Sequence, residues 1–591
     1  MFIWERLFYN LVKFLVIILG VWCFFLQVVR YGHYSQLSAK NCIRTINIGT
    51  PRGVIYDRNG KILAKDIPTL NLVFIPLDIK NIEKEAEILS NIISFNKYSL
   101  IEKFKKKYTN PYDRIVIKRN LSIEEVSLIE ENIDNLPGIF PQESIGRQYP
   151  LEDQTCHVVG YLGEISKEEL DALKDKGYKI GDTIGKDGVE RYYDTFLRGS
   201  PSGIQVEVDA LGHYRKVLKK QAGKTGNSLI LTIDSVIQRS AYKQLGNRSG
   251  CVVAMDPRNG EILALVSRPG FKPGEVEKYF NLASHPLVNR VIKGQYPPGS
   301  IFKIITEISA LETGEIQEYD RIECRGAMEI GDRVFHCWKD EGHGLIDINL
   351  ALPFSCNIFF GTCGIRVGVE KMLEYASKFG LGEKTGIDLP GEKRGHLPLK
   401  NETDPLNLAI GQGPILTTPI QLLSLISTVA NGGTIWEPFI VKKIVSPEGN
   451  ILKESSPLIN KTVFISSDTL AVLKKGLRNV VLFGTGHLAN IEGLEVSGKT
   501  GTAQRAGGES ELPTYGGFVC YAPSSNPQIA MVVFLDHASS AEAALIAGKI
   551  LKEVFIPEKG RIEENGETNE ETQEENKNPI EKSEEIENGI I

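Results

Sequence analysis

A serine and a lysine three residues apart offer a nucleophile and its base. Ser300 and Lys303 end a stretch in which two prolines and a glycine stop any earlier helix. If a helix begins here, both side chains lie on one face, one turn apart, beside free N–H groups. A lysine whose pKa is lowered by burial or by a second cation can accept the serine proton. The same residues also fit an ordinary capped helix with a surface lysine.

Two further motifs make the catalytic interpretation stronger. Ser355-Cys356-Asn357 follows about fifty residues later, and Lys499-Thr500-Gly501-Thr502 comes later still. Each motif alone is common, but S-x-x-K, S-x-N and K-T-G in this order are the set used by serine acyl-transferases. We therefore predict as catalytic residues Ser300, Lys303, Ser355, Asn357 and Lys499, and as substrate-binding residues Thr500, Gly501 and Thr502.

Each predicted residue has a role that its chemistry can fill. Ser355 can relay a proton between Lys303 and a leaving amine. Asn357 can hold a substrate amide and bind Lys303, and Lys499 brings a second cation that attracts a carboxylate and depresses the pKa of Lys303. The N–H groups of Ser300 and Thr502 would form the oxyanion hole.

Three cysteines and a histidine between the first two motifs could hold a metal. Cys324, Cys337, His343 and Cys356 follow the pattern C-x12-C-x5-H-x12-C. Three thiolates and an imidazole are a good tetrahedral zinc set, and a closed site would be structural. A disulfide between Cys324 and Cys337 is one alternative, and a merely buried Cys356 is another. Zinc is the first choice and the disulfide the second, and a zinc ion would fix the second motif beside Ser300.

The elements that must position these residues fall into several parts. Residues 11–29 carry one charge, Lys13, and the predicted anchor at 11–30 is long enough to span a membrane. They lack the small-residue cleavage site of a signal peptide, so we expect an uncleaved anchor. Residues 31–240 are β-rich, with a hairpin around Asp57 and a small α/β lobe at about 66–145. Charged residues there, such as Arg147 and Glu190, are expected to pair and hold the module together.

A new domain is expected from 245 to 557, beginning with a β-hairpin at 250–266. Residues 558–591 are dominated by Glu and Asn and are expected to form a disordered acidic tail.

The chain has 591 residues and a net charge of -6, which gives no sign of a nucleic-acid-binding surface. Its nine cysteines are an odd number in a large chain, which argues against a dense disulfide scaffold.

At these motifs the chain resembles the class B penicillin-binding proteins. Further matching stretches are Arg52–Gly60, Gly411-Gln412-Gly413 and Ser497–Gln504. The resemblance implies an α+β protein with a single transmembrane helix, an elongated pedestal or dimerisation-type domain, and a transpeptidase domain with a five-stranded antiparallel sheet between helices. It implies a D,D-transpeptidase that cross-links peptidoglycan stem peptides and is acylated by β-lactams, with no organic cofactor. It also implies a cytoplasmic N-terminus at 1–10, an inner-membrane location and a periplasmic catalytic domain, an orientation that the charges around the span leave open.

Within this family, Phe335–Lys339 and Gly342–Gly344 resemble the elongation-type enzyme, penicillin-binding protein 2. That resemblance implies a SEDS-family glycan polymerase and other elongation-complex membrane proteins as partners. Some relatives hold zinc with Asp in place of the first two cysteines. Asn357 departs from the Asp of many elongation enzymes. The alternatives are a division-type transpeptidase, a β-lactam sensor or β-lactamase-like protein, and a scaffold that activates a glycan polymerase.

Overall fold

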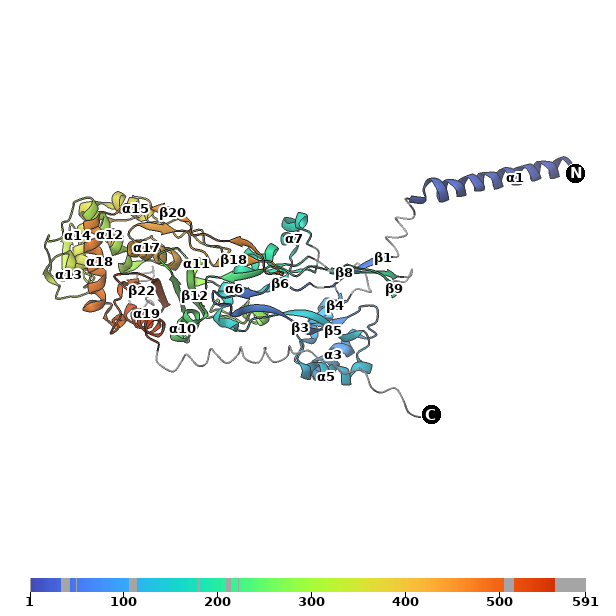
Figure 1. Cartoon of the computed structure of the whole chain (residues 1–591), viewed down its shortest axis with the longest axis horizontal. Coiled ribbons are helices and arrows are strands. Elements are labelled where there is room, and N and C mark those ends of the chain that lie inside the picture. The colour runs from blue at the N-terminus through green and yellow to red at the C-terminus, as the bar shows by residue number, and fades with distance from the viewer. Residues whose placement is uncertain are drawn as a thin grey trace, which may run out of the picture.

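A computed structural model describes residues 2–557, apart from 33, 35–42, 49, 106–113, 179–180, 201, 209–213, 222 and 504–514. The molecule is elongated (Figure 1). Helix α1 lies at one end of the long axis, a β-rich pedestal forms the middle, and a domain with a central sheet forms the far end. The predicted tail at 558–591 lies outside the described residues.

The N-terminal helix stands apart from the folded body. Helix α1 spans Phe2–Phe24 and continues as the π-helix η1, Phe25–Val29. Residues Leu7–Val29 have a mean hydropathy of 2.4, and none of the most apolar window is buried within the protein. A helix of this length and apolarity can cross a bilayer, because its exposed side chains then face lipid instead of water.

In the described residues, two larger sheets and the small antiparallel pair β6-β7 form the pedestal. The sheet next to α1 has the order β1-β8-β9, and the larger sheet has the order β19-β18-β10-β2-β3-β4, with β5 also paired to β3. The predicted hairpin around Asp57 is present, since β2 and β3 pair antiparallel across that turn. The pedestal strands are β1 (Ile43–Ile48), β2 (Ile55–Tyr56), β3 (Ile62–Phe74), β4 (Ile115–Lys118), β5 (Ile139–Gln148), β6 (Leu162–Glu164), β7 (Thr183–Gly185), β8 (Ser202–Val208), β9 (Tyr214–Gln221) and β10 (Ser228–Leu231).

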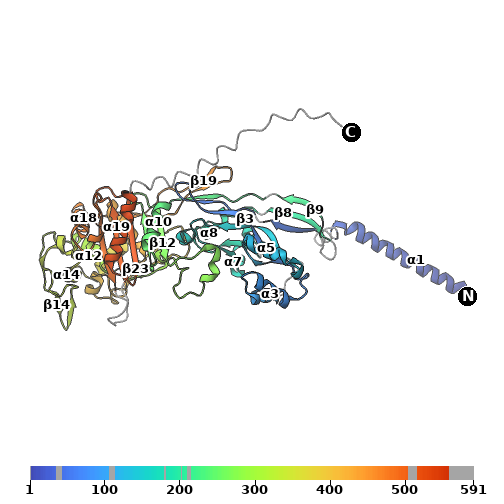
Figure 2. The same cartoon turned by 90° about the horizontal axis from the view of Figure 1, so that it is seen from below.

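A small lobe projects sideways from the pedestal (Figure 2). Its helices cover the far end of β3 and enclose a separate apolar core around Leu72, Phe74 and Leu89. The capping box of Ser122 and Glu125 starts its last helix, because each side chain satisfies a backbone N–H of the other. The helices of the pedestal and its lobe are α3 (Ile82–Ile92), α4 (Lys97–Lys105), α5 (Ile123–Glu131), α6 (Cys156–Val159), α7 (Lys167–Leu173), α8 (Gly188–Tyr192) and α9 (Asp194–Leu197).

Buried charges hold the pedestal together, as the sequence predicts. The Arg52 guanidinium donates to Glu190 Oε2 and to Asp194 Oδ1, both at 2.8 Å. Arg147 donates to the other Glu190 oxygen and to Asp66, also at 2.8 Å. Glu190 is fully buried, so each of its oxygens is satisfied by a guanidinium from a different segment. The network thereby joins four segments that are distant in sequence.

A five-stranded antiparallel sheet organises the far domain, with the order β12-β11-β23-β22-β21. Successive residues of its inner strands face opposite cores, so these strands read as continuous apolar runs. Helices α17 and α11 pack on one face, and α10 and α19 on the other. The strands are β11 (Gly250–Met255), β12 (Ile262–Arg268), β21 (Ser497–Ala503), β22 (Tyr515–Ala522) and β23 (Ile529–Asp536). The helices are α10 (Ser235–Leu245), α11 (Arg290–Lys293), α12 (Lys303–Glu312), α13 (Ile348–Ala351), α14 (Asn357–Val367), α15 (Val369–Lys378), α16 (Pro405–Ala409), α17 (Pro419–Asn431), α18 (Ser467–Leu482) and α19 (Ser540–Phe555).

One hairpin of the far half returns to the pedestal. Strand β18 (Val441–Val445) pairs antiparallel with β10, and β19 (Ile451–Glu454) pairs with β18 at the sheet edge. Two sequence regions on either side of residue 245 therefore share one sheet. Three small two-stranded sheets complete the far half: β13 (Ile322–Cys324) with β16 (Gly344–Ile346), β14 (Ala327–Ile330) with β15 (Arg333–His336), and β17 (Thr434–Trp436) with β20 (Ile459–Thr462).

Candidate active site

Ser300 lies in a 3-10 turn, η6 (Gly299–Phe302), that leads directly into α12. Gly299 has a φ of +54°, and a Cβ there would lie 2.5 Å from the Thr502 carbonyl oxygen. Only glycine fits such a position, so η6 can approach β21 this closely. The structure thus brings the predicted nucleophile to the strand that carries the K-T-G motif. Within the described residues the Ser300 hydroxyl makes no hydrogen bond, which leaves it free for a substrate.

Lys303 is the first residue of α12 and is fully buried. Its amine donates to the Ser355 carbonyl and to Asn357 Oδ1, both at 2.8 Å, and to Ser355 Oγ at 3.2 Å. Burial lowers the pKa of Lys303 to about 7, because a charged amine is poorly solvated there. A large fraction of the amine is then neutral near pH 7 and can accept a proton.

The second motif occupies a tight loop before α14. Ser355 has a φ of +52°, a left-handed conformation that costs a non-glycine residue energy. Cys356 caps α14 by accepting from the Phe359 N–H, and Asn357 is the first residue of that helix. The loop turns the Ser355 hydroxyl toward both lysine amines. Strained backbone of this kind is typical of functional positions that surrounding contacts hold in place.

Lys499 enters the same pocket from β21. Its amine donates to Ser355 Oγ at 3.0 Å and to the Thr500 carbonyl at 3.1 Å. The side chain is fully buried, and burial lowers its pKa well below the ordinary value, as does the neighbouring charge of Lys303. The Ser355 hydroxyl therefore lies between two buried amines.

The rest of the K-T-G motif runs along an edge of the central sheet, because among the described residues β21 pairs with β22 alone. A Cβ on Gly501 would lie 2.8 Å from Ile301 Cγ1, so glycine is required where η6 packs on the strand. The Thr500 hydroxyl hydrogen-bonds that of Thr485 at 2.6 Å, and the exposed Thr502 donates to Ser540 Oγ at 3.0 Å. A free edge strand can bind an extended peptide.

Sequence reasoning missed one buried acid beside this pocket. Glu307 follows Lys303 by one turn of α12 and is fully buried. Within the described residues, neither of its carboxyl oxygens has a hydrogen-bond partner. The signal in the sequence is a single carboxylate in an otherwise apolar helical stretch, Ile304 to Ile308, broken only by Thr306.

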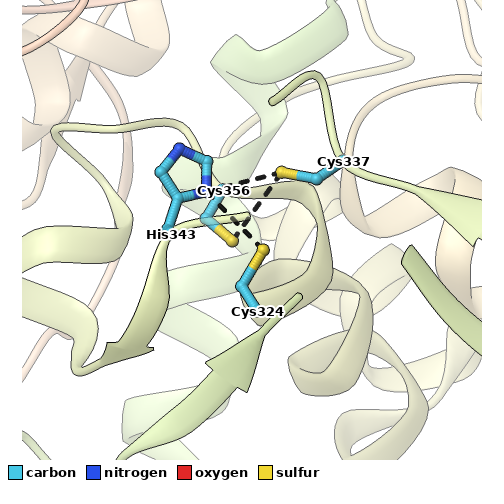
Figure 3. Close-up of side chains that lie close together, drawn as sticks. All are labelled: Cys324, Cys337, His343 and Cys356. Carbon is cyan, nitrogen blue, oxygen red and sulfur yellow. Dashed lines mark hydrogen bonds between the residues drawn. The ribbon is translucent and has the colours of Figure 1, made fainter. Parts of the chain in front are cut away.

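The four predicted metal ligands do converge (Figure 3). The three thiols and one imidazole nitrogen lie within 4.8 Å of one another. His343 Nδ1 is 3.6 Å from the Cys324 sulfur and 3.5 Å from that of Cys337, and the Cys337 and Cys356 sulfurs are 4.0 Å apart. Cys324 and Cys337 are free thiols, so the structure does not contain the alternative disulfide.

This Cys/His cluster adjoins the second motif. His343 stacks on Phe354 with ring centroids 5.8 Å apart, and Trp338 donates to the Phe354 carbonyl at 2.9 Å. The Asn357 amide donates to the His336 carbonyl at 3.3 Å, which links the motif to β15. Cys356 belongs to both the cluster and the motif. Anything that binds the cluster therefore acts on the loop that holds Ser355.

Comparison with known proteins agrees with this geometry. Residues 250–555 match the penicillin-binding protein transpeptidase domain, and residues 47–231 match the penicillin-binding protein dimerisation domain. The peptidoglycan D,D-transpeptidase MrdA of Acinetobacter baumannii is 32% identical over 570 residues, covering 90% of this chain and 84% of the relative. The chain belongs to the class B penicillin-binding proteins. It is of the elongation type, as its MrdA relatives and structural neighbours are.

Further relatives extend the comparison. Stage V sporulation protein D of Bacillus subtilis is 31% identical, covering 92% of this chain and 85% of the relative. A complex of penicillin-binding protein 2 and MreC from Helicobacter pylori aligns with a TM-score of 0.73 and 26% identity, covering 87% of this chain and 99% of that one. A peptidoglycan synthase complex that coordinates polymerization and crosslinking contains a chain that aligns with a TM-score of 0.66 and 26% identity, covering 93% of this chain and 97% of that one.

This class B penicillin-binding protein is therefore an enzyme, a serine-type peptidoglycan D,D-transpeptidase of cell elongation. The predicted α+β fold and family are confirmed. The division-type, sensor and scaffold alternatives gain no better support from the comparisons. Membrane anchoring is supported by the helix Leu7–Val29.

Proposed function

We propose a mechanism in which Ser300 attacks the D-Ala-D-Ala carbonyl of a stem peptide. Lys303 accepts the Ser300 proton as the new Oγ–C bond forms. The peptide C–N bond then breaks, and D-Ala leaves with a proton delivered through Ser355. An amine of a neighbouring stem peptide attacks the acyl-enzyme, forms the cross-link and returns Ser300 to its hydroxyl form. Asn357 orients the substrate amide.

The other residues of the pocket would bind substrate. Lys499, Thr500 and Thr502 would hold the terminal carboxylate, and the peptide would lie along the edge of β21 beside Gly501. The Ser300 and Thr502 N–H groups would stabilise the oxyanion. The observation that carries this proposal is the position of the Ser355 hydroxyl between two buried amines, 3.2 Å from Lys303 and 3.0 Å from Lys499. A hydroxyl so placed can pass a proton in either direction.

The test is covalent labelling by a fluorescent penicillin, together with cross-linking of lipid-linked glycan strands. We expect Ser300→Ala to abolish both, and the control Ser309→Ala, on the helix α12 that follows the Ser300 turn, to keep both. Label retained by Ser300→Ala would refute the proposal. Rapid loss of label from the wild type would indicate a β-lactamase. Normal cross-linking and growth of a Ser300→Ala strain would favour the scaffold role.

We also propose that the Cys/His cluster holds a structural zinc ion. With Zn–S near ~2.3 Å and Zn–N near ~2.0 Å, a tetrahedral site has edges of roughly 3.5–3.8 Å. The distances from His343 Nδ1 to the thiols of Cys324 and Cys337, and between the sulfurs of Cys337 and Cys356, are 3.5–4.0 Å. The donor set and its spacing thus fit the ion, which would supply rigidity to the Ser355 loop and no step of catalysis.

Metal analysis of the purified full chain tests the zinc site. We expect one zinc per chain in the wild type, and its loss in Cys337→Ser. Cys363→Ser is the matched control, since Cys363 is a buried thiol outside the cluster and should keep the zinc. Unchanged stoichiometric zinc in Cys337→Ser would rule out the site.

The anchor and the shape support a proposal for topology and partners. We infer a single-pass inner-membrane protein with residues 1–10 in the cytoplasm and the transpeptidase domain in the periplasm. Its partners would be a SEDS-family glycan polymerase and other elongation-complex membrane proteins, bound through α1 and the pedestal. A periplasm-dependent reporter should be active when fused after residue 557 and inactive at the N-terminus. Co-purification with the polymerase should be lost when Phe2–Val29 is replaced by an unrelated span.

A further inference from the structure

The thiols of Cys337 and Cys356 lie close enough to react with each other. Their sulfurs are 4.0 Å apart in the Cys/His cluster, and the Cys337 thiol points toward that of Cys356 (Figure 3). A disulfide has an S–S bond of about 2.05 Å, so an approach of roughly 2 Å would join them. The Cys324 sulfur instead contacts the His343 ring, at 3.6 Å. The geometry therefore favours Cys337 and Cys356 as a reactive pair.

Cys337 is the thiol of the cluster that solvent reaches most readily. It is 4% exposed, against 1% for Cys324 and none for Cys356. It follows the end of β15 and precedes the exposed Trp338, whereas Cys356 caps a helix of the core. A small oxidant such as a hydroperoxide therefore meets Cys337 first. Cysteines that respond to oxidants typically lie beside a second thiol that resolves the product, and Cys356 occupies that position.

Other buried cysteines lack such a partner. Cys251, Cys363 and Cys520 lie in apolar core clusters, and within the described residues none of their sulfurs contacts another sulfur. An oxidant that reached one of them would find no second thiol with which a disulfide could form. Paired thiols are thus a feature of the Cys/His cluster and not of the core as a whole.

A bond between the two sulfurs would act directly on the second catalytic motif. Cys356 lies between Ser355 and Asn357, and its sulfur caps α14 by accepting from the Phe359 N–H at 3.5 Å. Turning that sulfur toward Cys337 removes the cap. Ser355 has a strained φ of +52°, which persists only while neighbouring contacts hold it. Loss of the cap lets this loop relax and takes the Ser355 hydroxyl from between the two lysine amines.

We propose that Cys337 and Cys356 form an oxidative modification site that switches the transpeptidase off. Hydrogen peroxide converts the Cys337 thiol to a sulfenic acid, and its O–O bond breaks to release one water. The Cys356 sulfur then attacks the sulfenic sulfur, an S–S bond forms, and the hydroxyl leaves as a second water. The two thiols thereby lose two electrons and two protons, and a thiol reductant reverses the change.

The inference goes beyond the zinc site and the mechanism proposed above. With zinc bound, both sulfurs start as thiolates, the two protons come from solvent, and the ion is released because a disulfide has no thiolate to hold it. The loss of acylation rests on the role proposed for Ser355. Formation of the disulfide depends only on the placement of the two cysteines.

The test treats the purified full chain in detergent with hydrogen peroxide and then alkylates the remaining thiols. Peptide mapping by mass spectrometry should find Cys337 joined to Cys356. Labelling by a fluorescent penicillin should slow by about 10²-fold or more, the usual loss when a positioned proton-transfer group is removed. Dithiothreitol and added zinc should restore labelling, which separates a disulfide from oxidised methionine, since a thiol reductant leaves the latter unchanged.

Two variants locate the effect. Cys337→Ser lacks one partner, so its labelling, compared with that of the same untreated variant, should resist peroxide. Cys363→Ser keeps the pair and should lose labelling as the wild type does. If Cys337→Ser does not fold, mapping and reversal on the wild type decide the question. A disulfide that includes Cys324, or no disulfide at all, overturns the site, and an unchanged labelling rate in protein that carries the Cys337–Cys356 bond overturns the switch.

The same samples separate this inference from the earlier proposals. Protein that is purified without zinc and still forms the Cys337–Cys356 bond refutes the zinc site alone. Label on Ser300→Ala refutes the mechanism alone. A zinc-loaded wild type that keeps its thiols, its metal and its labelling under peroxide refutes only the oxidative switch.

Discussion

The pedestal and the active-site pocket both bury charged side chains, but they treat them in opposite ways. In the pedestal, both oxygens of Glu190 are bound by Arg52 and Arg147. In the pocket, Lys303 and Lys499 share one hydroxyl, no carboxylate binds either amine in the described residues, and Glu307 has no hydrogen bond. Charges that are paired stabilise a junction, whereas charges left unbalanced remain able to exchange protons.

This contrast separates two uses of burial. Pairing in the pedestal raises the pKa of Arg147 through Glu190 despite burial, so that its charge is permanent. Burial without a bound carboxylate lowers the pKa of Lys303 to about 7, so its charge is conditional. In the pedestal, the ion pairs offset the cost of removing the charge from water. In the pocket this cost is not offset, and it lowers the lysine pKa enough for the amine to exchange protons.

The largest effect is expected from Lys303→Met. Acylation should fall by about 10²–10⁴-fold, because the base that accepts the Ser300 proton is gone. Unlike loss of a pedestal charge, the change should leave the melting temperature equal or higher, since it removes a buried amine. Stopped-flow acylation and thermal unfolding measure the two quantities. A large fall in melting temperature would show that Lys303 is structural.

The next largest effect is expected from Glu190→Ala. This change removes the carboxylate that Arg52 and Arg147 share, so each buried guanidinium loses one of its acidic partners. The free energy of unfolding should fall by about 3–5 kcal/mol. The fraction that remains folded should acylate at the wild-type rate. Denaturant titration followed by active-site labelling checks both points. Slowed acylation at full folding would instead link the network to the pocket.

A pH titration should sharpen the comparison further. Acylation should rise with pH through about 7 as Lys303 loses its proton. Because the folded pKa of Lys303 lies below its unfolded value, the unfolded state binds more protons between about 7 and 10.5. Its contribution to stability therefore rises with pH in that window. Lys303→Met should remove this slope, and an unchanged slope would contradict the assignment.

The smallest effect is expected at the surface. Lys371, Glu374 and Lys378 form ion pairs at 2.8 Å on the exposed face of α15. Water and salt screen such pairs, so Lys371→Ala should change neither the melting temperature nor the acylation rate measurably. A clear change in either would mean that exposed pairs in this chain behave like the buried network.

Much of the site could be predicted because its chemistry is local in sequence. Ser300 and Lys303 need one helical turn, and Lys499 to Thr502 need one strand. The convergence of Cys324, Cys337, His343 and Cys356 could be predicted from their residue types and spacing. The left-handed Ser355 and the isolated Glu307 could not be predicted, because both depend on packing between distant segments. The pairing of Leu229 with Ile444 is likewise a contact across more than two hundred residues that no local pattern encodes.

The hairpin of β18 and β19 has a mechanical consequence. A single linker between two modules can bend and twist in any direction. Here the chain passes from the pedestal to the catalytic domain after β10. It returns to the pedestal sheet at β18 and leaves it again after β19. Backbone hydrogen bonds join β18 to β10 and β19 to β18. Torque applied to the larger pedestal sheet is thus transmitted to the catalytic domain through several paired strands. A catalytic fragment that begins at residue 245 would lack β10 and would leave the edge of β18 unpaired. An exposed strand edge of this kind promotes aggregation.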